Sequence, residues 1–499
     1  MANLVYLHLN KFERIIYRLK SFVCNVPKSI FNFFKKIPIL FVNLFKKVCS
    51  IFYNLRDFML FGDYKTKISF LIFGFGNIAN KQYFRGFLYL IYEIVFLAYM
   101  ILFGGKFLGD FGTLGTIETY ETENGFKVIG DNSFNILLFG VATILILFCT
   151  VFAWYSSIKQ AYSVQKLKSI NACLSTGRQD IKELGNKYYH ATLLSLPMLG
   201  LIVFTIIPLI FMIFVSFTNY NNLHMPPEKL FTWVGFENFS TLLTGNGLSG
   251  GNAVKFSYTF WNILLWTLTW AILATFTNFF IGMAVAIVIN KKGIHLKKVW
   301  RTVLVTTIAV PQFISLLLMS KMLSTDGVFN LILSWMGVGP ISWLLHPTLA
   351  KVTVVLVNLW VGVPYTVLSC TGILMNVPSD LYEAAKIDGA NPYKMFASIT
   401  LPYMMFVLGP SLITTFVGNI NNFNIIFLTT GGGPNFDPNM VSSAGQSDLL
   451  ITWLYKLTVN NQTYDMASVI GILVFIVVAT ISLIFYGRSS SVKNEEDFQ

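Results

Sequence analysis

The stretch that decides the fold reads Glu383-Ala384-Ala385-Lys386-Ile387-Asp388-Gly389, and after nine further residues it continues with Ile399-Thr400-Leu401-Pro402. It is a polar insert between two long apolar segments. In a chain that crosses a bilayer, an insert of this kind offers a surface to a soluble partner. The sequence therefore predicts a polar helical hairpin between two membrane spans.

Local propensities predict the first arm of this hairpin. Asp380 with Glu383 three residues later resembles a capping box, so we expect a helix to begin near Leu381. The residues 384–386 are strong helix formers. Gly389 then supplies the left-handed residue that ends the helix.

The second arm begins at Asn391-Pro392, which predicts an N-cap followed by the first helical residue. We expect this helix to run to about Thr400, where Pro402 stops it before the next span. A solvated hairpin that links two spans without any partner remains the alternative on these grounds alone.

Composition places the chain in the membrane class. Charged residues make up 12% of its 499 residues and hydrophobic residues 55%, whereas a soluble domain carries about 25% charged residues. The net charge of +13 does not indicate nucleic acid, because the basic residues do not gather in a patch on a soluble domain. The five cysteines contain no C-x-x-C pair, so neither a disulfide framework nor a metal site is expected.

A transmembrane helix needs about 20 mostly apolar residues, and eight segments meet this requirement. They are 86–104, 134–156, 191–217, 260–289, 300–323, 350–375, 404–428 and 467–487. The sequence therefore predicts an all-α integral membrane protein with eight transmembrane helices and with both termini on one side.

Basic residues orient these spans. Of the 36 Lys and Arg residues, 29 fall in or next to the regions that share the side of the termini, and 7 fall on the other side. Those regions are 1–85, 157–190, 290–299, 376–403 and 488–499. Positive residues favour the cytoplasmic side, so we expect the termini and the loop 376–403 in the cytoplasm.

The first 85 residues predict a cytoplasmic amphipathic and interfacial region. Polar residues from Lys28 to Asn54 recur at helical spacing on one face, and apolar residues fill the other. Such a helix lies on the membrane with its Lys side chains toward anionic head groups, here kinked at Pro27 and Pro38. The run 68–79 is too short to span and is interpreted as interfacial or re-entrant. No cleaved signal peptide is expected.

Three of the expected spans carry neutral polar or small residues at one depth, where buried polar groups are costly and are therefore functional candidates. The set comprises Gln312 in 300–323; Asn358, Val361, Gly362 and Tyr365 in 350–375; and Thr415, Gly418, Asn419 and Asn422 in 404–428. Amides can pair with sugar hydroxyls, and an aromatic ring can cover the apolar face of a sugar. The same amides could instead join helices to one another or to a second membrane subunit.

From about Tyr189 to Arg488 the chain resembles the larger membrane subunit of maltose/maltodextrin importers, which are binding-protein-dependent ABC importers. The spacing E-A-A-x3-G-x9-I-x-L-P resembles the cytoplasmic coupling loop of that superfamily. The sugar-contacting spans and the outer loop of the family are similar to residues 358–365, 419–423, 429–434 and 444–450.

This resemblance implies a type I ABC importer permease fold, with a cytoplasmic coupling helix that docks onto a separate ATPase. The ATPase-coupling residues would be Glu383, Ala384, Ala385, Gly389, Ile399, Leu401 and Pro402. The implied partners are a second homologous permease subunit, a dimer of ATP-binding cassette ATPase, an extracellular sugar-binding protein, membrane lipids and an oligosaccharide substrate. The chain has no G-x-x-x-x-G-K-[ST] phosphate loop, so ATP and Mg are expected on the partner ATPase and no cofactor in this chain.

Ile308, Gln312 and Gly418 stand where the best-known member of the family has Tyr, Ser and Phe. The length and linkage of the oligosaccharide therefore stay open. The large extracytoplasmic domain of that member is also missing, because residues 218–259 are too few for it.

The sequence thus predicts a non-enzymatic permease subunit for maltodextrin-type oligosaccharides in a bacterial cytoplasmic membrane. The expected domains are 1–85, the first two spans and a linker at 86–188, a permease core of six spans at 189–488, and a tail at 489–499. A permease for another oligosaccharide, such as galacto-oligosaccharide, is the first alternative. A stand-alone secondary transporter is the second, disfavoured because the spans beside the coupling loop contain no Asp, Glu or His.

Overall fold

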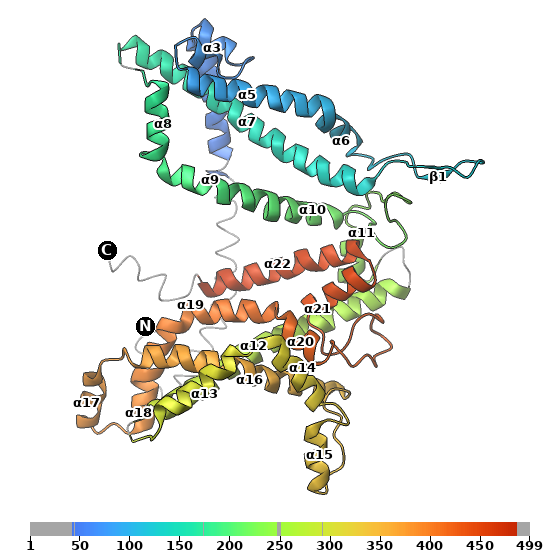
Figure 1. The fold of residues 1–499 in the computed structure, drawn as a ribbon, viewed down its shortest axis with the longest axis vertical. Coiled ribbons are helices and arrows are strands. Elements are labelled where there is room, and N and C mark those ends of the chain that lie inside the picture. The colour runs from blue at the N-terminus through green and yellow to red at the C-terminus, as the bar shows by residue number, and fades with distance from the viewer. Residues whose placement is uncertain (1–41, 44, 173, 247–250, 292, 487–499) are drawn as a thin grey trace, which may run out of the picture. The chain divides into compact units, whose positions relative to one another are not determined.

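The chain folds almost entirely into helices (Figure 1). A computed structural model describes residues 42–486 except 44, 173, 247–250 and 292. The contacts among residues divide the chain into two units, of which the first ends at Trp233 and the second begins at Val234.

The first unit consists of helices and one small hairpin. Residues 45–61 are helical. The elements that follow are α3 (Tyr64–Ile68), α4 (Phe75–Ile78), α5 (Tyr83–Tyr99), the π-helical turn η1 (Met100–Gly104), α6 (Gly105–Asp110), β1 (Tyr120–Glu121), β2 (Lys127–Val128), α7 (Ser133–Ser169), α8 (Gly177–Gly185), α9 (Tyr189–Leu201), the π-helical turn η2 (Ile202–Ile206) and α10 (Ile207–Val215). The strands β1 and β2 are antiparallel, with Tyr120 opposite Val128.

Helices α5 and α7 pack antiparallel. The hydroxyl of Tyr92 lies 2.9 Å from Oγ1 of Thr150, and the hydroxyl of Tyr99 lies 2.8 Å from Oγ1 of Thr143. Residue numbers therefore rise along one helix as they fall along the other. In a bilayer, such bonds between helices satisfy polar groups that lipid cannot.

Residues 68–79 do not form a span. They fold into turns and the short α4, with the N–H of Gly74 donating to Oγ of Ser157 (2.8 Å). The N–H of Phe73 donates to Oε2 of Glu93 (2.9 Å). The lone carboxylate within α5 is thus hydrogen-bonded to the backbone of this segment.

The expected amphipathic region lies mostly outside the described residues, including both prolines at 27 and 38. Within the helix 45–61, the polar Lys46 and the apolar Phe45 and Phe52 are all exposed. Further along the same helix, Phe58 is buried against the rings of Tyr155 and Tyr162 of α7.

The second unit is built along one long helix, α12, against which α16 and α19 pack. Its elements are α11 (Glu237–Thr244), α12 (Gly251–Asn290), α13 (Lys297–Ala309), α14 (Gln312–Met322), α15 (Val328–Trp335), α16 (Pro347–Leu374), α17 (Ser379–Ile387), α18 (Pro392–Met395), the π-helical turn η3 (Phe396–Thr400), α19 (Leu401–Ile420), α20 (Phe423–Thr429), α21 (Leu450–Tyr455), the π-helical turn η4 (Lys456–Asn460) and α22 (Tyr464–Tyr486).

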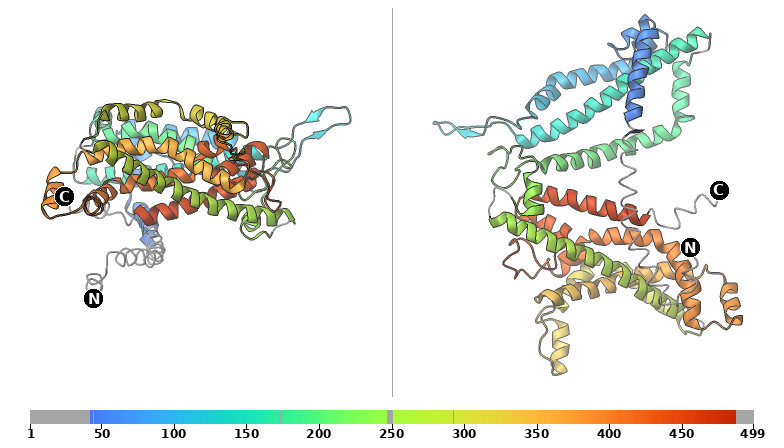
Figure 2. Two further views of the ribbon diagram at one scale, coloured as in Figure 1. Left: turned by 90° about the horizontal axis from the view of Figure 1, so that it is seen from below. Right: turned by 180° about the vertical axis from the view of Figure 1, so that it is seen from behind.

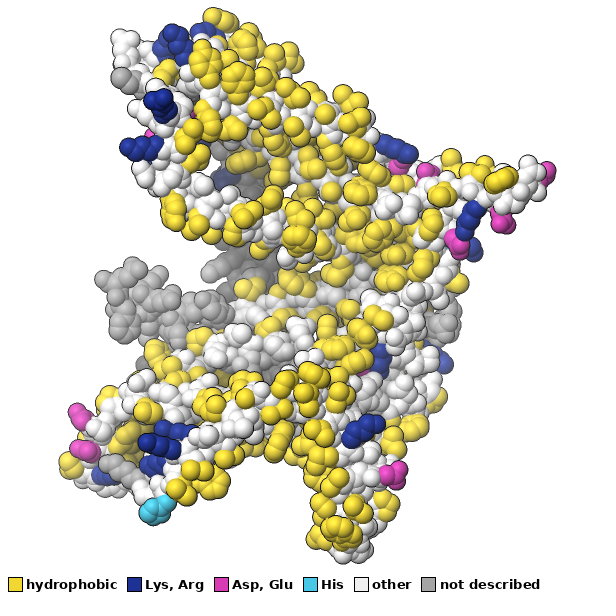
Figure 3. Space-filling view, in the orientation of Figure 1, with side chains coloured by type: hydrophobic (Ala, Val, Ile, Leu, Met, Phe, Trp, Pro, Cys, Tyr) yellow, Lys and Arg dark blue, Asp and Glu magenta, His cyan; other side chains and the backbone are white. Residues whose placement is uncertain are grey.

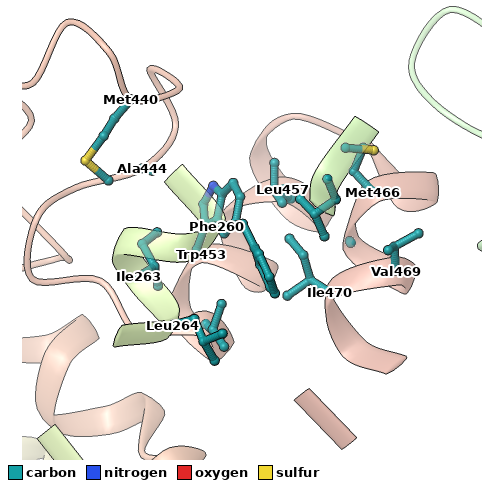
Figure 4. Close-up of a cluster of buried hydrophobic side chains, with 13 residues drawn as sticks. Phe260, Ile263, Leu264, Met440, Ala444, Trp453, Leu457, Met466, Val469 and Ile470 are labelled. Carbon is teal, nitrogen blue, oxygen red and sulfur yellow. The ribbon is translucent and has the colours of Figure 1, made fainter. Parts of the chain in front are cut away.

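Three clusters of buried side chains follow one another along α12. Figure 4 shows the first, in which Phe260 of α12, Trp453 of α21 and Ile470 of α22 come together. The second surrounds Trp270 and draws on α14, α16 and α20, and the third surrounds Phe279 and draws on α16 and α19. The sides of α16 and α19 that face α12 are therefore buried.

The remaining helix surface is strongly apolar. Figure 3 shows hydrophobic side chains covering much of the visible face of the helices. Exposed Leu, Ile, Val and Phe side chains occur along α5, α9, α12 and α16. Exposed apolar surface on this scale is expected where lipid or another membrane subunit surrounds the protein.

Seven helical segments in the described residues are long and apolar enough to cross a membrane. They are Tyr83–Asp110, Ser133–Ser169, Tyr189–Val215, Ala253–Asn290, Pro347–Leu374, Pro392–Ile420 and Tyr464–Phe485. These confirm seven of the eight predicted spans and the all-α membrane class. The domain boundaries at 85/86 and 188/189 stay predictions, and the contacts place α9 and α10 in the first unit with α5 and α7.

The prediction of one continuous helix across 300–323 is wrong, and the segment counts as an eighth span only if its two helices form one broken span. The segment is a pair of helices, Lys297–Ala309 and Gln312–Met322, bent by 92°. Pro311 has no N–H and its ring forces the preceding residue out of the helical region, and Val310 is accordingly extended (φ −75°, ψ 126°). Gln312 therefore begins a helix instead of lying at the centre of one.

The end predicted for the seventh span is also wrong. Helix α19 stops at Ile420 and the separate α20 starts at Phe423. Asn422 is the N-cap of α20, and its side chain accepts the N–H of Ile425. Because Asn favours caps over helix interiors, the chain turns here and does not continue to residue 428 as one helix.

Candidate functional site

Two of the predicted polar positions on α16 face α12. Asn358 is 3% exposed, and its Nδ2 donates to the carbonyl oxygen of Ala274 at 3.5 Å. Gly362 lies so close to Asn278 that a Cβ atom at this position would overlap the side-chain amide. Both positions thus form part of the contact between α12 and α16.

Asn419 on α19 also faces α12. Its Nδ2 donates to Oγ1 of Thr275 at 2.9 Å, and its carbonyl oxygen accepts from Nε1 of Trp270 at 3.0 Å. Its Oδ1 accepts from Nδ2 of Asn422 at 3.3 Å. Asn422 is therefore beside Asn419 although it caps α20 and lies outside α19, which corrects the prediction that one continuous helix carries both residues.

Three other predicted positions are open to the surroundings of the unit. Tyr365 is 54% exposed, Thr415 is exposed, and a Cβ at Gly418 would meet no atom within 4 Å. Val361 is partly buried against the cluster around Trp270. The structure thus separates the set into buried amides of α16 and α19 that face α12, and an open row on the same two helices.

Gln312 stands apart from this set. It is partly exposed at the start of α14. Within the described part of the chain, no hydrogen bond joins it to the other predicted residues. The structure therefore brings together the residues of α16, α19 and α20 through α12, and leaves Gln312 outside that network.

Sequence reasoning missed the polar residues of α12 that organise the site. Thr275 and Asn278 are both buried, and Oδ1 of Asn278 accepts no hydrogen bond from the described residues. The signal was present, because a hydroxyl and an amide lie three residues apart near the middle of the predicted span 260–289. Buried polar groups are normally paired, so Asn278 is a candidate for contact with a ligand or with water.

The hairpin α17–α18 projects from the ends of α16 and α19 (Figures 1 and 2). Helix α17 begins at Ser379 after Pro378, so the prediction of Asp380 as an N-cap is wrong. Proline pre-sets the backbone that leads into the helix, and Asp380 instead lies in the first turn, where a carboxylate is favourable near the positive end of the helix dipole.

The predicted end of α17 at Gly389 is confirmed. Gly389 has φ +70°, and its N–H donates to the carbonyl of Lys386 at 3.0 Å. The N–H of Ala390 donates to the carbonyl of Ala385 at 2.9 Å. These two bonds form a Schellman motif, in which the left-handed residue is usually glycine.

The start of α18 is confirmed, because the side chain of Asn391 accepts the N–H of Lys394 and Pro392 occupies the first turn. The prediction that Pro402 stops this helix is wrong. A π-helical turn, Phe396–Thr400, carries the chain through into α19. The wider turn accommodates the missing N–H of Pro402, so the second arm of the hairpin is continuous with the span.

The surface of the hairpin is open. Glu383, Ala384, Gly389 and Pro402 are exposed, while Ala385, Ile399 and Leu401 are partly buried. Sequence reasoning missed two large exposed side chains, Ile387 (87%) and Tyr393 (76%). It also missed the bond between the hydroxyls of Tyr382 and Thr400 (2.9 Å), because contacts across 18 residues leave no local pattern. That bond ties the two arms together.

The family model of the binding-protein-dependent transport system inner membrane component matches residues 278–491. A galactooligosaccharides transport system permease protein of Bacillus subtilis (strain 168) is 33% identical over 429 residues, which cover 85% of this chain and 97% of the relative. The chain belongs to this permease family.

A second relative and one solved structure are also similar to this chain. A maltodextrin transport system permease protein of Streptococcus pneumoniae (strain ATCC BAA-334 / TIGR4) is 33% identical over 438 residues, covering 85% of this chain and 95% of the relative. The crystal structure of a bacterial ABC transporter involved in the import of alginate aligns with 62% of this chain and 98% of its own, at 23% identity and a TM-score of 0.49. The family model and the two relatives confirm the resemblance to maltodextrin-type permeases, and the hairpin and the polar set both belong to a permease.

Proposed function

We propose that this permease moves maltodextrin-type oligosaccharides into the cell as one subunit of an ATP-driven importer. The observation that carries the proposal is the continuity of the exposed hairpin with the two helices that bear the polar set. Helix α16 leads into α17 within a few residues, and α18 runs through η3 into α19. A force on the hairpin would therefore act directly on the helices that line the proposed sugar path.

The hairpin suits the coupling role by its construction. The Schellman motif at Gly389 and the bond between Tyr382 and Thr400 fix the two arms relative to each other. Small Ala side chains on α17 permit close approach of a partner, and the exposed Ile387 and Tyr393 add apolar contact area. The partner would be an ATPase dimer that binds ATP and Mg, with the hairpin on the cytoplasmic side.

The open row on α16 and α19 supports the assignment of the sugar path. The ring of Tyr365 can cover the apolar face of a sugar, while Thr415 and Asn422 supply hydrogen-bonding groups beside the open Gly418. Asn358, Val361, Gly362 and Asn419 lie behind this row, and their contacts with α12 also fit a role in joining helices. A second permease subunit would close the path, and an extracellular binding protein would deliver the sugar.

A galacto-oligosaccharide substrate is the second candidate, favoured by the relative from Bacillus subtilis. The complete transporter, reconstituted with its ATPase and binding protein, should show sugar-stimulated ATP hydrolysis with maltodextrins and little with galacto-oligosaccharides. The reverse response would assign the second substrate class.

Lipid vesicles that contain the same reconstituted transporter also test which energy source drives uptake. Uptake should stop when ATP is removed and should continue when an ionophore collapses the ion gradients, because ATP hydrolysis on the partner drives it. Uptake that survives ATP depletion and fails with the ionophore would instead identify a secondary transporter.

A further inference from the structure

A cavity of about 450 Å³ lies among α5, α7 and α8 of the first unit. These three helices are found in Figure 1 by their labels, and α5 contacts both of the others. None of the residues that line this cavity belongs to the proposed sugar path or to the coupling hairpin. The function proposed above therefore leaves it without a role.

The cavity is elongated and has two different ends. Because α5 and α7 run antiparallel, Arg85 and Gln160 lie at one end, and Tyr92 and Ala153 lie two helical turns away. Seven residues along a helix span about 10 Å. Leu88 lines the wall between the ends, so a polar end passes into an apolar one along the helix axis.

The polar end contains an ion pair with spare hydrogen-bonding capacity. Nη2 of Arg85 lies 2.6 Å from Oδ1 of Asp180 and 3.7 Å from Oε2 of Glu183. Asp180 is only 4% exposed, yet its Oδ2 accepts no hydrogen bond from the described residues, and neither does Oε1 of Gln160. Two residues that line the cavity thus each hold a buried acceptor oxygen without a donor, although buried polar atoms are normally paired.

This arrangement selects ligands by their donors. A carboxylate oxygen and an amide oxygen need O–H or N–H groups. Arg85 is 32% exposed and carries five N–H groups, of which the ion pairs use those of one nitrogen. The remaining N–H groups can reach a phosphate, which guanidinium groups bind well. The apolar end, at the depth of the span Tyr83–Asp110, suits a hydrocarbon chain.

We propose that this cavity binds one phospholipid whose head group carries hydrogen-bond donors. The head group donates to Oδ2 of Asp180 and Oε1 of Gln160, the phosphate lies beside Arg85, and an acyl chain follows Leu88 toward Tyr92. The donors are the glycerol hydroxyls of a phosphatidylglycerol or the primary ammonium of a phosphatidylethanolamine. Phosphatidylcholine has neither kind of donor and serves as the matched control lipid.

The test is native mass spectrometry of the purified full chain in its assembled transporter, titrated separately with phosphatidylglycerol, phosphatidylethanolamine and phosphatidylcholine of the same acyl composition. We expect one bound lipid per chain, held about tenfold more tightly when its head group carries donors. The lipid with the greater affinity identifies the hydroxyl or the ammonium as the donor. Equal affinity for phosphatidylcholine, or no bound lipid because water alone fills the cavity, would overturn the proposal.

Variants localise the binding. Gln160→Leu replaces one acceptor by an apolar side chain of similar size and breaks no hydrogen bond among the described residues, so the transporter should assemble and elute as wild type. Its preference for the donor-bearing lipid should fall several-fold, whereas Ser163→Ala, at an exposed hydroxyl three residues along α7, should leave it unchanged. An undiminished preference in Gln160→Leu would place the lipid elsewhere and refute this site.

Discussion

At the scale of single residues, Gly362 and Gly418 show how the surroundings decide what a glycine does. Both were predicted as members of the polar set on equal grounds. Gly362 lies against the amide of Asn278, whereas Gly418 faces open space. The first lets two helices approach, and the second leaves room beside the proposed sugar path.

Gly362→Ala should therefore destabilise the protein. The added methyl group must displace Asn278 or separate α16 from α12, and overpacking of this kind costs about 1–3 kcal/mol. Thermal unfolding of the purified chain in detergent measures the effect as a lower midpoint. Combining Gly362→Ala with Asn278→Ala should restore much of the loss.

Gly418→Ala is the matched control. Its Cβ would meet no atom within 4 Å, and alanine favours a helix over glycine by about 0.5–1 kcal/mol. Its unfolding midpoint should equal or exceed that of the wild type. Equal destabilisation by the two substitutions would contradict the packing role assigned to Gly362.

At the scale of elements, the coupling hairpin is held by backbone geometry at one end and by side chains across its arms. Gly389 at φ +70° closes α17, and Tyr382 bonds Thr400 on the opposite arm. The π-helical turn Phe396–Thr400 then joins the hairpin to α19 without a break. In the proposed coupling role, the hairpin would transmit displacement only while its turn keeps this shape.

Gly389→Pro should abolish uptake while the chain still inserts and assembles. Proline fixes φ near −65° and removes the N–H that donates to Lys386, so α17 would end differently. Uptake of labelled sugar into cells should fall below about one-tenth of the wild-type rate, a change equivalent to roughly 1.4 kcal/mol of lost coupling. Membrane fractionation would report insertion.

Gly389→Asn controls for the loss of glycine itself, because Asn adopts the left-handed conformation more readily than other residues. It should keep most of the uptake. Wild-type transport by Gly389→Pro would rule out the coupling role of this turn.

At the scale of the whole molecule, the basic residues predict which loops face the cytoplasm. This prediction is tested by placing single cysteines in a chain whose five native cysteines have been replaced. Asn124→Cys lies in the loop between β1 and β2, and Asp388→Cys lies at the end of α17, both at exposed positions. A membrane-impermeant maleimide should label Asn124→Cys in intact cells and Asp388→Cys only after permeabilisation, because the first is expected outside and the second inside.

The reverse labelling pattern would place the termini outside and would remove the hairpin from the compartment that holds ATP. Labelling of both positions in intact cells would mean that the two loops share one side and that the assigned number of spans between them is wrong. Each outcome is read from the same gel, with the cysteine-free chain as the unlabelled reference.

The membrane class, seven spans and the ends of the hairpin at Gly389 and Asn391 could be predicted from sequence. Each depends on a local property: twenty apolar residues make a span, glycine permits positive φ, and asparagine caps a helix. Pro311 itself predicts a break in the helix, but the high hydropathy of residues 300–323 led to the prediction of one continuous span. The polar character of Thr275 and Asn278 is visible in the sequence, but the partners of these two residues and of Tyr382 were not predictable, because those partners lie far away along the chain.

By itself, then, the sequence Glu383–Pro402 determined that a polar hairpin joins two spans and that the chain resembles an importer permease. Only the tertiary structure decided which polar residues face α12, that α18 continues into α19, and that a cavity with unpaired oxygens lies among α5, α7 and α8. The reason is physical. Propensity and hydropathy act within one or two helical turns, whereas the partner of a buried polar group is set by how separate helices pack.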